Sequence, residues 1–404
     1  MTPPGYSLYR ARSIELRPAQ HPPHDRIGYS VTWRELGRQP LRLATDVDKK
    51  WKEQMSDAVT YGIGVVGCGR AATELHLPAL QSLPEARIVA VADAESTARE
   101  HAARRFGVAE LHPDVSGLLE LPEVDVIAVC VPVTAHVAAA LPVIESGRHL
   151  LVEKPLAAGP EECERLISAA AGKPVRTAVG FNLRFHRLVQ DARAAVESGR
   201  LGRIEGIQST WSSAIRRRRA LPAWRNARAT GGGALFEIAI HHFDLWRFLV
   251  GSEITEIHAV SHSGETPDET VAVTALHANG AISSGMFSER SADQNTLELL
   301  GREGRMKLDL FRYDGLNLSQ ADELPGFGTR IRKSLAAAAE IPKGIALMRK
   351  GGDFLLSYQH QWRQFLHSIG SGAFEGATLE DGYAAVRAVL AAVESADTHR
   401  PVML

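Results

Sequence analysis

Cysteine is scarce in this sequence, and the signatures of several special protein classes are missing. The chain of 404 residues holds three cysteines, Cys68, Cys130 and Cys163, which are far apart and form no C-x-x-C pair. This usage argues against a disulfide scaffold or a zinc site and predicts reduced thiols in a cytoplasmic protein. The sequence also lacks the apolar core of a secretory signal peptide and any run of 18 or more apolar residues that could span a membrane.

An excess of charge of one sign is lacking as well. Lys and Arg together number 46 and Asp and Glu 47, which leaves a formal net charge of −1. Without an overall basic field, the protein is not expected to bind nucleic acid or an anionic membrane. A hydrophobic fraction of 45% and a charged fraction of 23% are typical of a globular protein, and the length predicts two domains.

The first 60 residues lack the pattern of a folded domain. They contain scattered charge and several prolines, and no hydrophobic period of 2 or 3.6 residues continues through them. Met55-Ser56-Asp57 stands just before the first expected strand, as an ordinary N-terminus would. We hypothesise that the native protein starts at Met55 and that residues 1–54 are an artefact of start assignment or a disordered leader. The alternative is a real arm that helps oligomerisation, and the intact mass of protein from the native host distinguishes the two.

Residues 61–180 alternate between short apolar runs and helical segments. This alternation predicts βα units and a parallel, doubly wound sheet of the α/β class. Expected strands lie at 63–66, 87–92, 108–111, 124–131, 149–152 and 175–180, and expected helices at 97–106, 114–120, 134–146 and 161–171.

The pattern changes after residue 180. Next come a helix over 185–198, a strand over 204–213, a polar loop over 214–230 and a Gly-opened helix over 231–250. Strands are then expected at 253–261, 270–277, 281–288, 295–300 and 306–310, and a largely helical stretch over 328–396. A run of strands without intervening helices predicts an α+β domain with an open, mostly antiparallel sheet. We therefore divide the chain into an N-terminal extension, 1–60, a Rossmann domain, 61–180, and an α+β domain, 181–404.

The stretch 61–93 organises the rest of the chain. An apolar run leads into G-C-G-R-A-A, a helical segment and a second apolar run that ends in Asp93, which together form the dinucleotide-binding fingerprint of a βαβ unit. Gly67 permits the tight turn, Gly69 lets the backbone approach a pyrophosphate, and Ala72 lets the helix pack closely on the strand. The helix N-terminus offers its free N–H groups to the phosphates. Asp93 would accept both ribose hydroxyls, which favours NAD over NADP because a 2′-phosphate would meet a negative charge.

Two further motifs carry ionisable groups. Glu153-Lys154-Pro155 closes an expected strand, so Lys154 should lie at the carboxyl edge of the parallel sheet, where such folds bind ligands. In the Gly-opened helix, Glu237, His241 and Asp244 follow at spacings of four and three, so they should share one face. A carboxylate beside an imidazole can fix its tautomer and raise its basicity. Such a pair suits proton transfer to or from an alcohol while a hydride moves to a nicotinamide.

Each of these residues also has a purely structural interpretation. Lys154 could be a solvated surface lysine and His241 a satisfied core histidine. A metal site built from Glu237, His241, His242 and Asp244 is not expected, because no H-E-x-x-H or comparable spacing is present.

The polar loop poses the same choice. The run Arg216–Arg219 is either a solvated loop segment or a site for an anionic substrate such as a uronic acid or sugar nucleotide. Trp224 and Arg225 could stack on a sugar or anchor the loop.

At this point the chain resembles a known family, the Gfo/Idh/MocA oxidoreductases. The resemblance covers about residues 61–404 and rests on the following motifs: G-C-G-R-A-A, H-L-P-A-L, E-K-P-L, V-G-F-N-L-R-F, L-G-R-I and the G-G-G…E-I-A-I-H-H-F-D helix. It implies that Lys154 and His241 are the catalytic proton-transfer pair and that Glu237 is the partner of His241. The implied cofactor-binding residues are Gly67, Gly69, Arg70, Ala71, Ala72, Asp93, Pro132, His136, Glu153 and Lys154, and the expected substrate-binding residues are Lys154, Arg184, Trp224, Arg225, Glu237 and His241.

The resemblance also implies a cofactor, a substrate class and an assembly. NAD is expected, with NADP possible, and the substrate should be a secondary alcohol of a sugar, cyclitol or sugar nucleotide. Family members commonly form homodimers or homotetramers through the open sheet. Two departures stand out: Glu237 replaces the usual Asp, and Val133 replaces the Asn of the family's T-P-N-x-x-H loop.

Two rival functions come from other classes. A non-catalytic relative of the same fold senses NAD(P) and regulates transcription, although the presence of both Lys154 and His241 argues against lost catalysis. A hydrolase or lyase that uses tightly held NAD transiently would turn over its substrate with no net change in the redox state of the nicotinamide.

Overall fold

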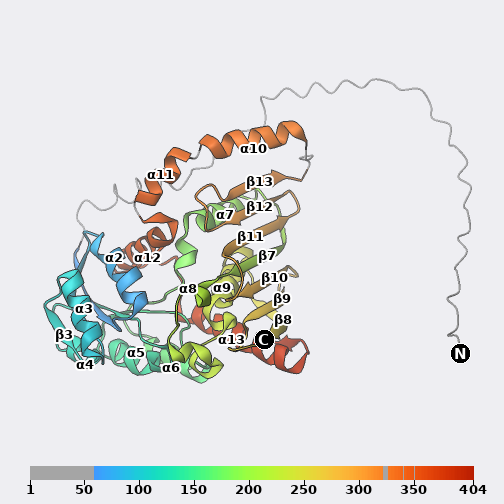
Figure 1. Ribbon diagram of the computed structural model, residues 1–404. Coiled ribbons are helices and arrows are strands. Elements are labelled where there is room, and N and C mark those ends of the chain that lie inside the picture. The colour runs from blue at the N-terminus through green and yellow to red at the C-terminus, as the bar shows by residue number, and fades with distance from the viewer. Residues whose placement is uncertain (1–58, 322–325, 340, 350) are drawn as a thin grey trace, which may run out of the picture. The chain divides into compact units, whose positions relative to one another are not determined.

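The computed structural model of the protein describes residues 59–404, except 322–325, 340 and 350. The hypothetical start at Met55 and the leader or arm before it lie outside the described residues. All described residues belong to one compact unit of the chain, and this unit contains two sheets (Figure 1).

The first sheet has six strands, all parallel, in the order β3-β2-β1-β4-β5-β6. Its strands are β1 (Tyr61–Val66), β2 (Ala86–Ala92), β3 (Glu110–His112), β4 (Val126–Val129), β5 (His149–Val152) and β6 (Thr177–Val179). The helical elements of this part are η1 (Ala71–His76), α2 (Leu77–Gln81), α3 (Ser96–Phe106), α4 (Val115–Leu119), η2 (Val133–Ala135), α5 (His136–Glu145) and α6 (Pro160–Ala170). The strand order reverses between β1 and β4, and a crevice at such a switch point is where doubly wound sheets bind ligands.

The central strands are buried along their whole length. Every residue of β4 is buried, as are all but the first residue of β1 and of β5. Strands covered by helices on both faces read as continuous apolar runs, which is why the sequence predicts this parallel sheet correctly.

The second sheet has eight strands, in the order β13-β12-β11-β7-β10-β9-β8-β14. The strands are β7 (Ile204–Ser212), β8 (Ile254–His262), β9 (Thr270–His277), β10 (Ile282–Ser288), β11 (Gln294–Gly301), β12 (Gly304–Asp309), β13 (Leu316–Gln320) and β14 (Val402–Met403). Only β7 and β10 pair in parallel, so the sheet is mixed and mostly antiparallel. The expected fold class is confirmed, but β13 and β14 were not predicted.

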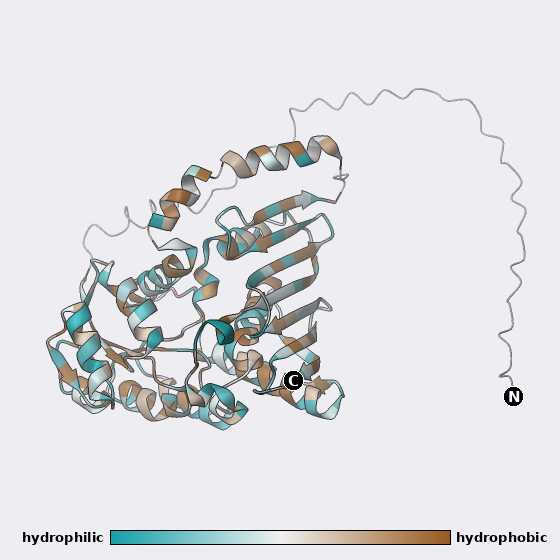
Figure 2. Cartoon of the chain, viewed as in Figure 1, coloured by the Kyte–Doolittle hydropathy of each residue, from teal (hydrophilic) through white to brown (hydrophobic). Residues whose placement is uncertain are grey.

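One face of this sheet is covered and the other is open. Burial alternates strictly along β9, and Figure 2 shows polar and apolar residues alternating along these strands. Helices α9 (Ile240–Val250), α13 (Leu379–Thr398) and α7 (Arg187–Glu197) pack on the covered face. Exposed apolar side chains occur on the open face and its edges, at Val260, Leu276, Ile282, Met286 and Leu300.

The last helices connect the second sheet to the first. α12 (Gly352–Ser371) packs against α2, and α13 packs against α6 as well as β8. The remaining helical elements are η3 (Asn182–Phe185), α8 (Ile215–Arg218), η4 (Ala223–Asn226), η5 (Arg228–Thr230), η6 (Leu235–Ala239), α10 (Phe327–Ala339) and α11 (Ile341–Arg349). No helix in the described part of the chain is both long and apolar enough to cross a membrane.

Candidate active site

The Gly-rich turn follows β1 at the switch point of the parallel sheet. Gly67 has a φ of 91°, and a Cβ at this position would lie 2.6 Å from the backbone of Cys130, so only glycine fits. Gly69 differs, because a Cβ there would meet no protein atom within 4 Å. The space beside Gly69 is therefore open to a ligand, as a pyrophosphate-binding turn requires.

Asp93 ends β2 beside this turn. Its Oδ2 accepts a hydrogen bond of 2.6 Å from the N–H of Cys68, and its Oδ1 accepts one of 2.9 Å from Glu95. The carboxylate is thus held at the mouth of the turn, where it can also accept from ribose hydroxyls. No cation forms an ion pair with Asp93 among the described residues.

Two cavities meet at the Gly-rich turn. The larger, of about 540 Å³, is lined by Gly67, Gly69, Asp93 and Pro132 among others. The smaller, of about 350 Å³, is lined by Gly69, Arg70, Ala71, Pro132, His136, Glu153 and Lys154 from the first domain and by Trp224, Arg225 and Glu237 from the second. All predicted cofactor residues therefore line one cavity or both, except Ala72, which is fully buried in the core. The arrangement fits an extended dinucleotide with its two halves in adjoining cavities.

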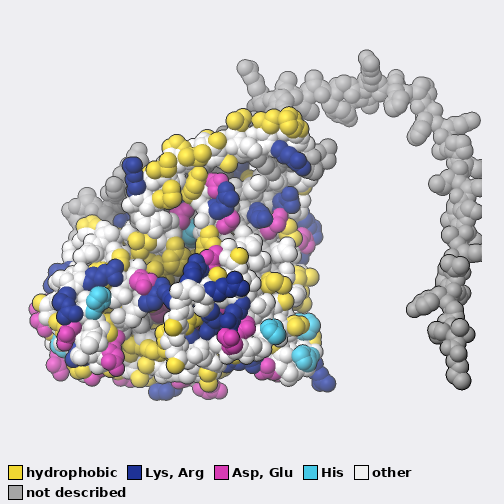
Figure 3. Space-filling model, in the orientation of Figure 1, with side chains coloured by type: hydrophobic (Ala, Val, Ile, Leu, Met, Phe, Trp, Pro, Cys, Tyr) yellow, Lys and Arg dark blue, Asp and Glu magenta, His cyan; other side chains and the backbone are white. Residues whose placement is uncertain are grey.

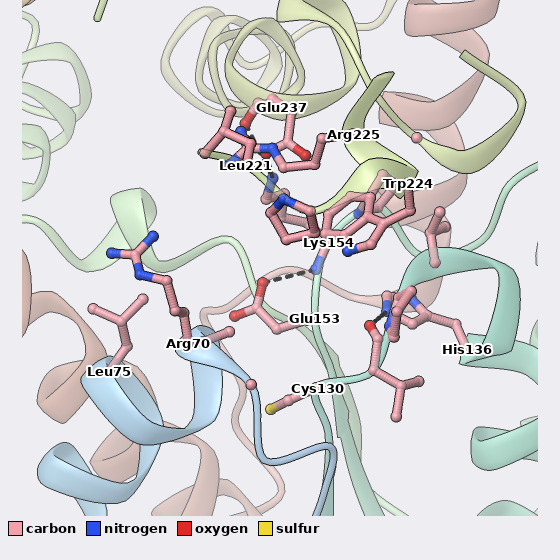
Figure 4. Close-up of a pocket in the computed structure, with 18 of the residues that line it drawn as sticks. Arg70, Leu75, Cys130, His136, Glu153, Lys154, Leu221, Trp224, Arg225 and Glu237 are labelled. Atoms are coloured by element: carbon pink, nitrogen blue, oxygen red, sulfur yellow. Dashed lines mark hydrogen bonds and ion pairs between the residues drawn. The ribbon is translucent and has the colours of Figure 1, made fainter. Parts of the chain in front are cut away.

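Lys154 and Glu237 meet across the smaller cavity. The ammonium of Lys154 donates a hydrogen bond of 3.0 Å to the backbone carbonyl of Glu237, and it lies 3.9 Å from Oε2 of the same residue. That oxygen is also 2.6 Å from Nη2 of Arg225. Figure 4 shows Glu153 and Lys154 in the middle of the cavity, with Arg70 to one side and Arg225 and Glu237 above them.

The expected pairing of Glu237 with His241 is not formed. His241 packs against the rings of Phe181 and Trp211, and its Nδ1 is buried with no hydrogen-bond partner in the described chain. Burial, followed by the positive charge of Lys154, lowers the pKa of this histidine well below its usual value and keeps the imidazole neutral. His241 is 6% exposed and does not belong to the wall of the smaller cavity.

The reason for this difference lies in the local helix geometry. Residues 235–239 form a π-helical turn, η6, before the regular helix α9 begins. A wide turn of this kind changes which residues share a face, so the i,i+4 rule used for Glu237 and His241 does not apply across it. A second π-helical turn, η1, begins directly after Arg70. Two of the helices that border the smaller cavity thus start with a π-turn, a feature that is frequent at functional sites.

Arg184 and Asp244 are paired with each other in the core. The Arg184 guanidinium is 5% exposed and donates two hydrogen bonds to Asp244, of 2.9 and 2.6 Å, and one of 3.1 Å to Asp381. The cation is paired in the core and lines neither cavity, so its contacts do not support the expectation that it binds substrate, which stays a prediction. Asp244 likewise faces Arg184 rather than the face of Glu237.

A hydrogen-bond chain behind Lys154 was not predicted. The indole N–H of Trp362 donates to Nδ1 of His76 at 3.0 Å, and Nε2 of His76 lies 2.7 Å from Oε1 of Glu153. An indole can only donate, so His76 must carry its proton on Nε2 and donate it to Glu153. The other oxygen of Glu153 accepts the backbone N–H of Lys154 at 3.1 Å. The chain fixes the backbone that carries Lys154.

His76 lies in the H-L-P-A-L motif, so the sequence marked this position without indicating its role. Its partner Trp362 is fully buried and 286 residues away, which no local pattern could connect. Burial of Glu153 favours the neutral acid, but the hydrogen bond from His76, together with the positive charge of Lys154, outweighs burial and lowers the pKa of the carboxyl.

The loop between β7 and η6 is held by ion pairs. Glu289, 1% exposed, binds Nη2 of Arg216 at 2.8 Å and Nη2 of Arg225 at 3.0 Å. Arg228 binds the buried Asp268 at 2.6 Å. Arg216 therefore serves as an anchor rather than a solvated charge. Trp224 lines the cavity next to Arg225, whose guanidinium lies 5.9 Å from the indole ring.

Comparison with known proteins agrees with the fold and the cofactor cavity described above. The model of an oxidoreductase family with an NAD-binding Rossmann fold, Gfo/Idh/MocA, matches residues 61–181, and the model of that family's C-terminal domain matches residues 189–307. The chain belongs to the Gfo/Idh/MocA family. It is an NAD-dependent oxidoreductase, and the fit of the Gly69 and Asp93 surroundings to a dinucleotide agrees with this.

The relatives of this Gfo/Idh/MocA protein include several sugar and cyclitol dehydrogenases. The chain is 27% identical to myo-inositol 2-dehydrogenase of Thermotoga maritima, over 85% of this chain and 98% of that protein. It is 29% identical to levoglucosan dehydrogenase of Pseudarthrobacter phenanthrenivorans, over 60% of this chain and 69% of that protein. A solved structure of levoglucosan dehydrogenase with NADH and levoglucosan shares the fold, with a TM-score of 0.73, 23% identity, and coverage of 85% and 99% of the two chains.

One departure from the pattern implied by the resemblance, Val133, lies in a loop that packs against the second domain. Val133 is buried, and a Cβ added to Gly231 would lie only 2.8 Å from its Cγ1. The side chain therefore packs under the Gly-rich start of the second-domain helix. His136 of the same loop is buried, with Nε2 2.9 Å from the carbonyl oxygen of Val131. The ring therefore braces the loop that lines the cavity. No group of His, Cys, Asp or Glu suited to a metal ion occurs among the described residues.

Proposed function

We propose that this protein is a dehydrogenase that transfers a hydride between the nicotinamide of NAD and a secondary alcohol of a sugar, cyclitol or sugar nucleotide. The observation that carries the proposal is the position of the Lys154 ammonium. It lines the cavity that adjoins the Gly-rich turn, and it is held there by the carbonyl of Glu237 at 3.0 Å. The relatives named myo-inositol 2-dehydrogenase and levoglucosan dehydrogenase support the substrate class.

The residues would divide the work as follows. Gly67 and Gly69 shape the turn that receives the pyrophosphate, and Asp93 accepts the ribose hydroxyls. NAD, when bound, supplies the hydride acceptor or donor. The substrate hydroxyl would contact Lys154, which in its neutral amine form would take up the hydroxyl proton and as the ammonium would return it. Glu237 keeps the ammonium in place through its carbonyl and carboxylate oxygens.

We further propose that His241 shares the proton with Lys154. Its imidazole is kept neutral by burial, and the positive charge of Lys154 acts on it directly. Its Nδ1 has no hydrogen-bond partner in the described chain, which leaves this nitrogen free to exchange a proton. Glu237 does not orient the ring, in contrast to the role that the family resemblance implies.

The test combines cofactor binding with turnover. NADH and NADPH are titrated separately by fluorescence, and NADH should bind more tightly because Asp93 would repel a 2′-phosphate. Sugars, cyclitols and sugar nucleotides are then screened with NAD for NADH formation. Lys154→Met should lower kcat by about 100-fold or more while NADH binding persists. Lys173→Met, at an exposed position after α6, is the matched control.

Two results would contradict the proposal. If neither nucleotide binds and the denatured protein releases none, the chain is no dehydrogenase. If a substrate is converted with no net change in nicotinamide redox state, the protein is a hydrolase or lyase that uses NAD transiently.

We also propose that the protein forms a homodimer or homotetramer through the open face of its second sheet. Ile282 and Met286, each 54% exposed, lie on the central strand β10 of that face. An apolar open face of this kind is a common site of association. Light scattering should show the oligomer, and glutamates at both positions should dissociate it to monomers.

A further inference from the structure

In the described part of the chain, Arg219 is a cavity-lining arginine of the loop that lacks the carboxylate partner of its paired neighbours. Arg216 and Arg225 bind Glu289, and Arg218 binds Asp293 at 2.6 Å. The guanidinium of Arg219, in contrast, has no hydrogen bond or ion pair with any described residue, and its Nε is buried. Arg219 lines the smaller cavity together with Lys154.

The surroundings of Arg219 are positive. Partial burial, and then the charges of Arg70, Arg225 and Arg218, lower the pKa of its guanidinium. The one carboxylate that acts in the opposite direction is Glu74, and both oxygens of Glu74 already accept hydrogen bonds from Arg70. Figure 3 shows Lys and Arg side chains gathered over α8, the element that precedes Arg219.

The charges that line the smaller cavity do not cancel. Four cations, Arg70, Lys154, Arg219 and Arg225, stand against two carboxylates, Glu153 and Glu237. Glu153 is bound by His76 and by the backbone of Lys154, and Glu237 is bound by Arg225. Arg70 and Arg225 have carboxylate partners, so the guanidinium without a partner among the described residues is that of Arg219, and a cavity with such a group is complementary to an anionic ligand.

We propose that Arg219 binds a carboxylate or phosphate group that the substrate carries beside its reacting alcohol, and that Arg70 assists it. The substrate class is then a sugar acid, sugar phosphate or sugar nucleotide rather than a neutral sugar or cyclitol. This inference rests on the proposed function, because it assigns the substrate of the same site.

The cofactor pyrophosphate is the other possible source of the anion. The geometry favours the substrate, because Arg219 belongs to the second-domain loop and lines only the cavity of Lys154. It does not line the larger cavity, which contains Asp93 and Gly67. Gly69 lines both cavities, so the NADH affinity of an Arg219 variant is the measurement that separates the two sources of the anion.

The experiment compares matched ligands on two variants. Glucuronate, glucose 6-phosphate and UDP-glucose are tested against glucose and myo-inositol, both as substrates with NAD and for binding to the NADH-loaded protein by calorimetry. Arg219→Gln removes the charge, and Arg217→Gln removes a neighbouring, exposed arginine that does not line the cavity. The affinity of each variant for NADH is measured in parallel.

We expect at least one anionic ligand to bind or react about 10-fold better than the neutral ones, and Arg219→Gln to remove about 10- to 100-fold of that preference. Arg217→Gln should retain it, and NADH affinity should change less than about twofold in both variants. Arg219-dependent binding of an anionic ligand without any turnover would support this inference while contradicting the dehydrogenase function.

Three results would overturn the inference. The first is equal or better binding and turnover of the neutral ligands, which leaves the dehydrogenase function intact. The second is a preference for anionic ligands that Arg219→Gln does not alter. The third is a loss of NADH affinity in Arg219→Gln as large as any loss for substrate, which would assign Arg219 to the cofactor pyrophosphate.

Discussion

The carboxylate of Glu237 lies between two cations, with Oε2 2.6 Å from Nη2 of Arg225 and 3.9 Å from Nζ of Lys154. The longer side chain of Glu, which stands where the family resemblance implies an Asp, is what allows the carboxylate to reach Arg225. Shortening the side chain by one methylene would withdraw the carboxylate by about 1.5 Å, and the close contact with Arg225 would be lost.

Glu237→Asp should therefore lower kcat/KM by about 10- to 100-fold with little effect on NADH affinity, because small displacements at the reacting centre are costly. Steady-state kinetics and NADH titration measure the two effects. Glu161→Asp, at the exposed start of α6, is the matched control. A Glu237→Asp enzyme as active as the original would show that the ion pair with Arg225 is not needed for turnover.

The two glycines of the dinucleotide turn should fail in different ways when they are replaced by alanine. At Gly67 the new Cβ meets the backbone of Cys130 and the φ of 91° is strained, so Gly67→Ala should lower the free energy of unfolding by about 1–3 kcal/mol or more. At Gly69 the new Cβ meets no protein atom within 4 Å. Gly69→Ala should thus melt like the original protein but bind NADH at least about 10-fold more weakly. Unchanged NADH binding in Gly69→Ala would place the pyrophosphate elsewhere.

Trp362 should matter for catalysis although it lies outside both cavities. Trp362→Phe removes the N–H that donates to Nδ1 of His76. The imidazole proton can then move from Nε2 to Nδ1, and in that tautomer the hydrogen bond from Nε2 to Glu153 is lost. We expect a loss of about 1–3 kcal/mol in stability and a severalfold fall in kcat with a nearly unchanged affinity for NADH.

Trp246 offers a matched control for this substitution. It is also fully buried, and its indole donates to Ser209 Oγ at 2.7 Å, within the second domain. Trp246→Phe should cost similar stability and leave kcat near its original value. An equal fall in kcat in both variants would mean that the effect on catalysis comes from lost stability alone.

Acid should destabilise the protein through its buried histidines. Burial lowers the pKa of His242 to about 3, whereas in the unfolded chain the pKa is about 6.5. Above pH 6.5 both states are neutral and stability is constant. Below pH 6.5 His242 binds a proton in the unfolded chain but stays neutral in the folded protein. The free energy of unfolding therefore falls by about 1.4 kcal/mol per pH unit for this one residue until about pH 3.

The measurement is the free energy of unfolding in urea between pH 4 and pH 8. His242→Gln keeps a donor for Asn295 but cannot titrate, so its slope below pH 6 should be smaller by about 1.4 kcal/mol per pH unit. His101→Gln, on an exposed position of α3, should leave the slope unchanged. A parallel pH dependence in His242→Gln and the original protein would exclude this histidine as a source.

Local patterns were sufficient for much of the fold. The buried runs of β1 and β4 read as continuous apolar segments, and β9 reads as a strict alternation, because burial on two faces or on one face dictates composition directly. The short strands β13 and β14 carry no such signal. They exist because neighbouring strands offer free backbone groups for pairing.

The candidate site was predictable where one motif carries one group, as for Lys154 and Asp93. It was not predictable where a side chain chooses among distant partners. Arg184 is paired with Asp381, which lies 197 residues away, and Trp362 reaches His76 from the far end of the chain. The predicted contact between Glu237 and His241 assumed the spacing of a regular α-helix. The π-turn before α9 breaks that spacing, so the two side chains do not pair.

The loop between β7 and η6 is fastened to two buried carboxylates. Arg216 and Arg225 bind Glu289, and Arg228 binds Asp268, so these ion pairs set the path of the loop, and Arg225 also lines the cavity. The segment between the anchors, residues 217–224, can change in sequence while the chemistry around Lys154 stays in place. New substrate preferences can therefore evolve, or be engineered, by exchanging this segment as a cassette between relatives that keep the anchoring arginines.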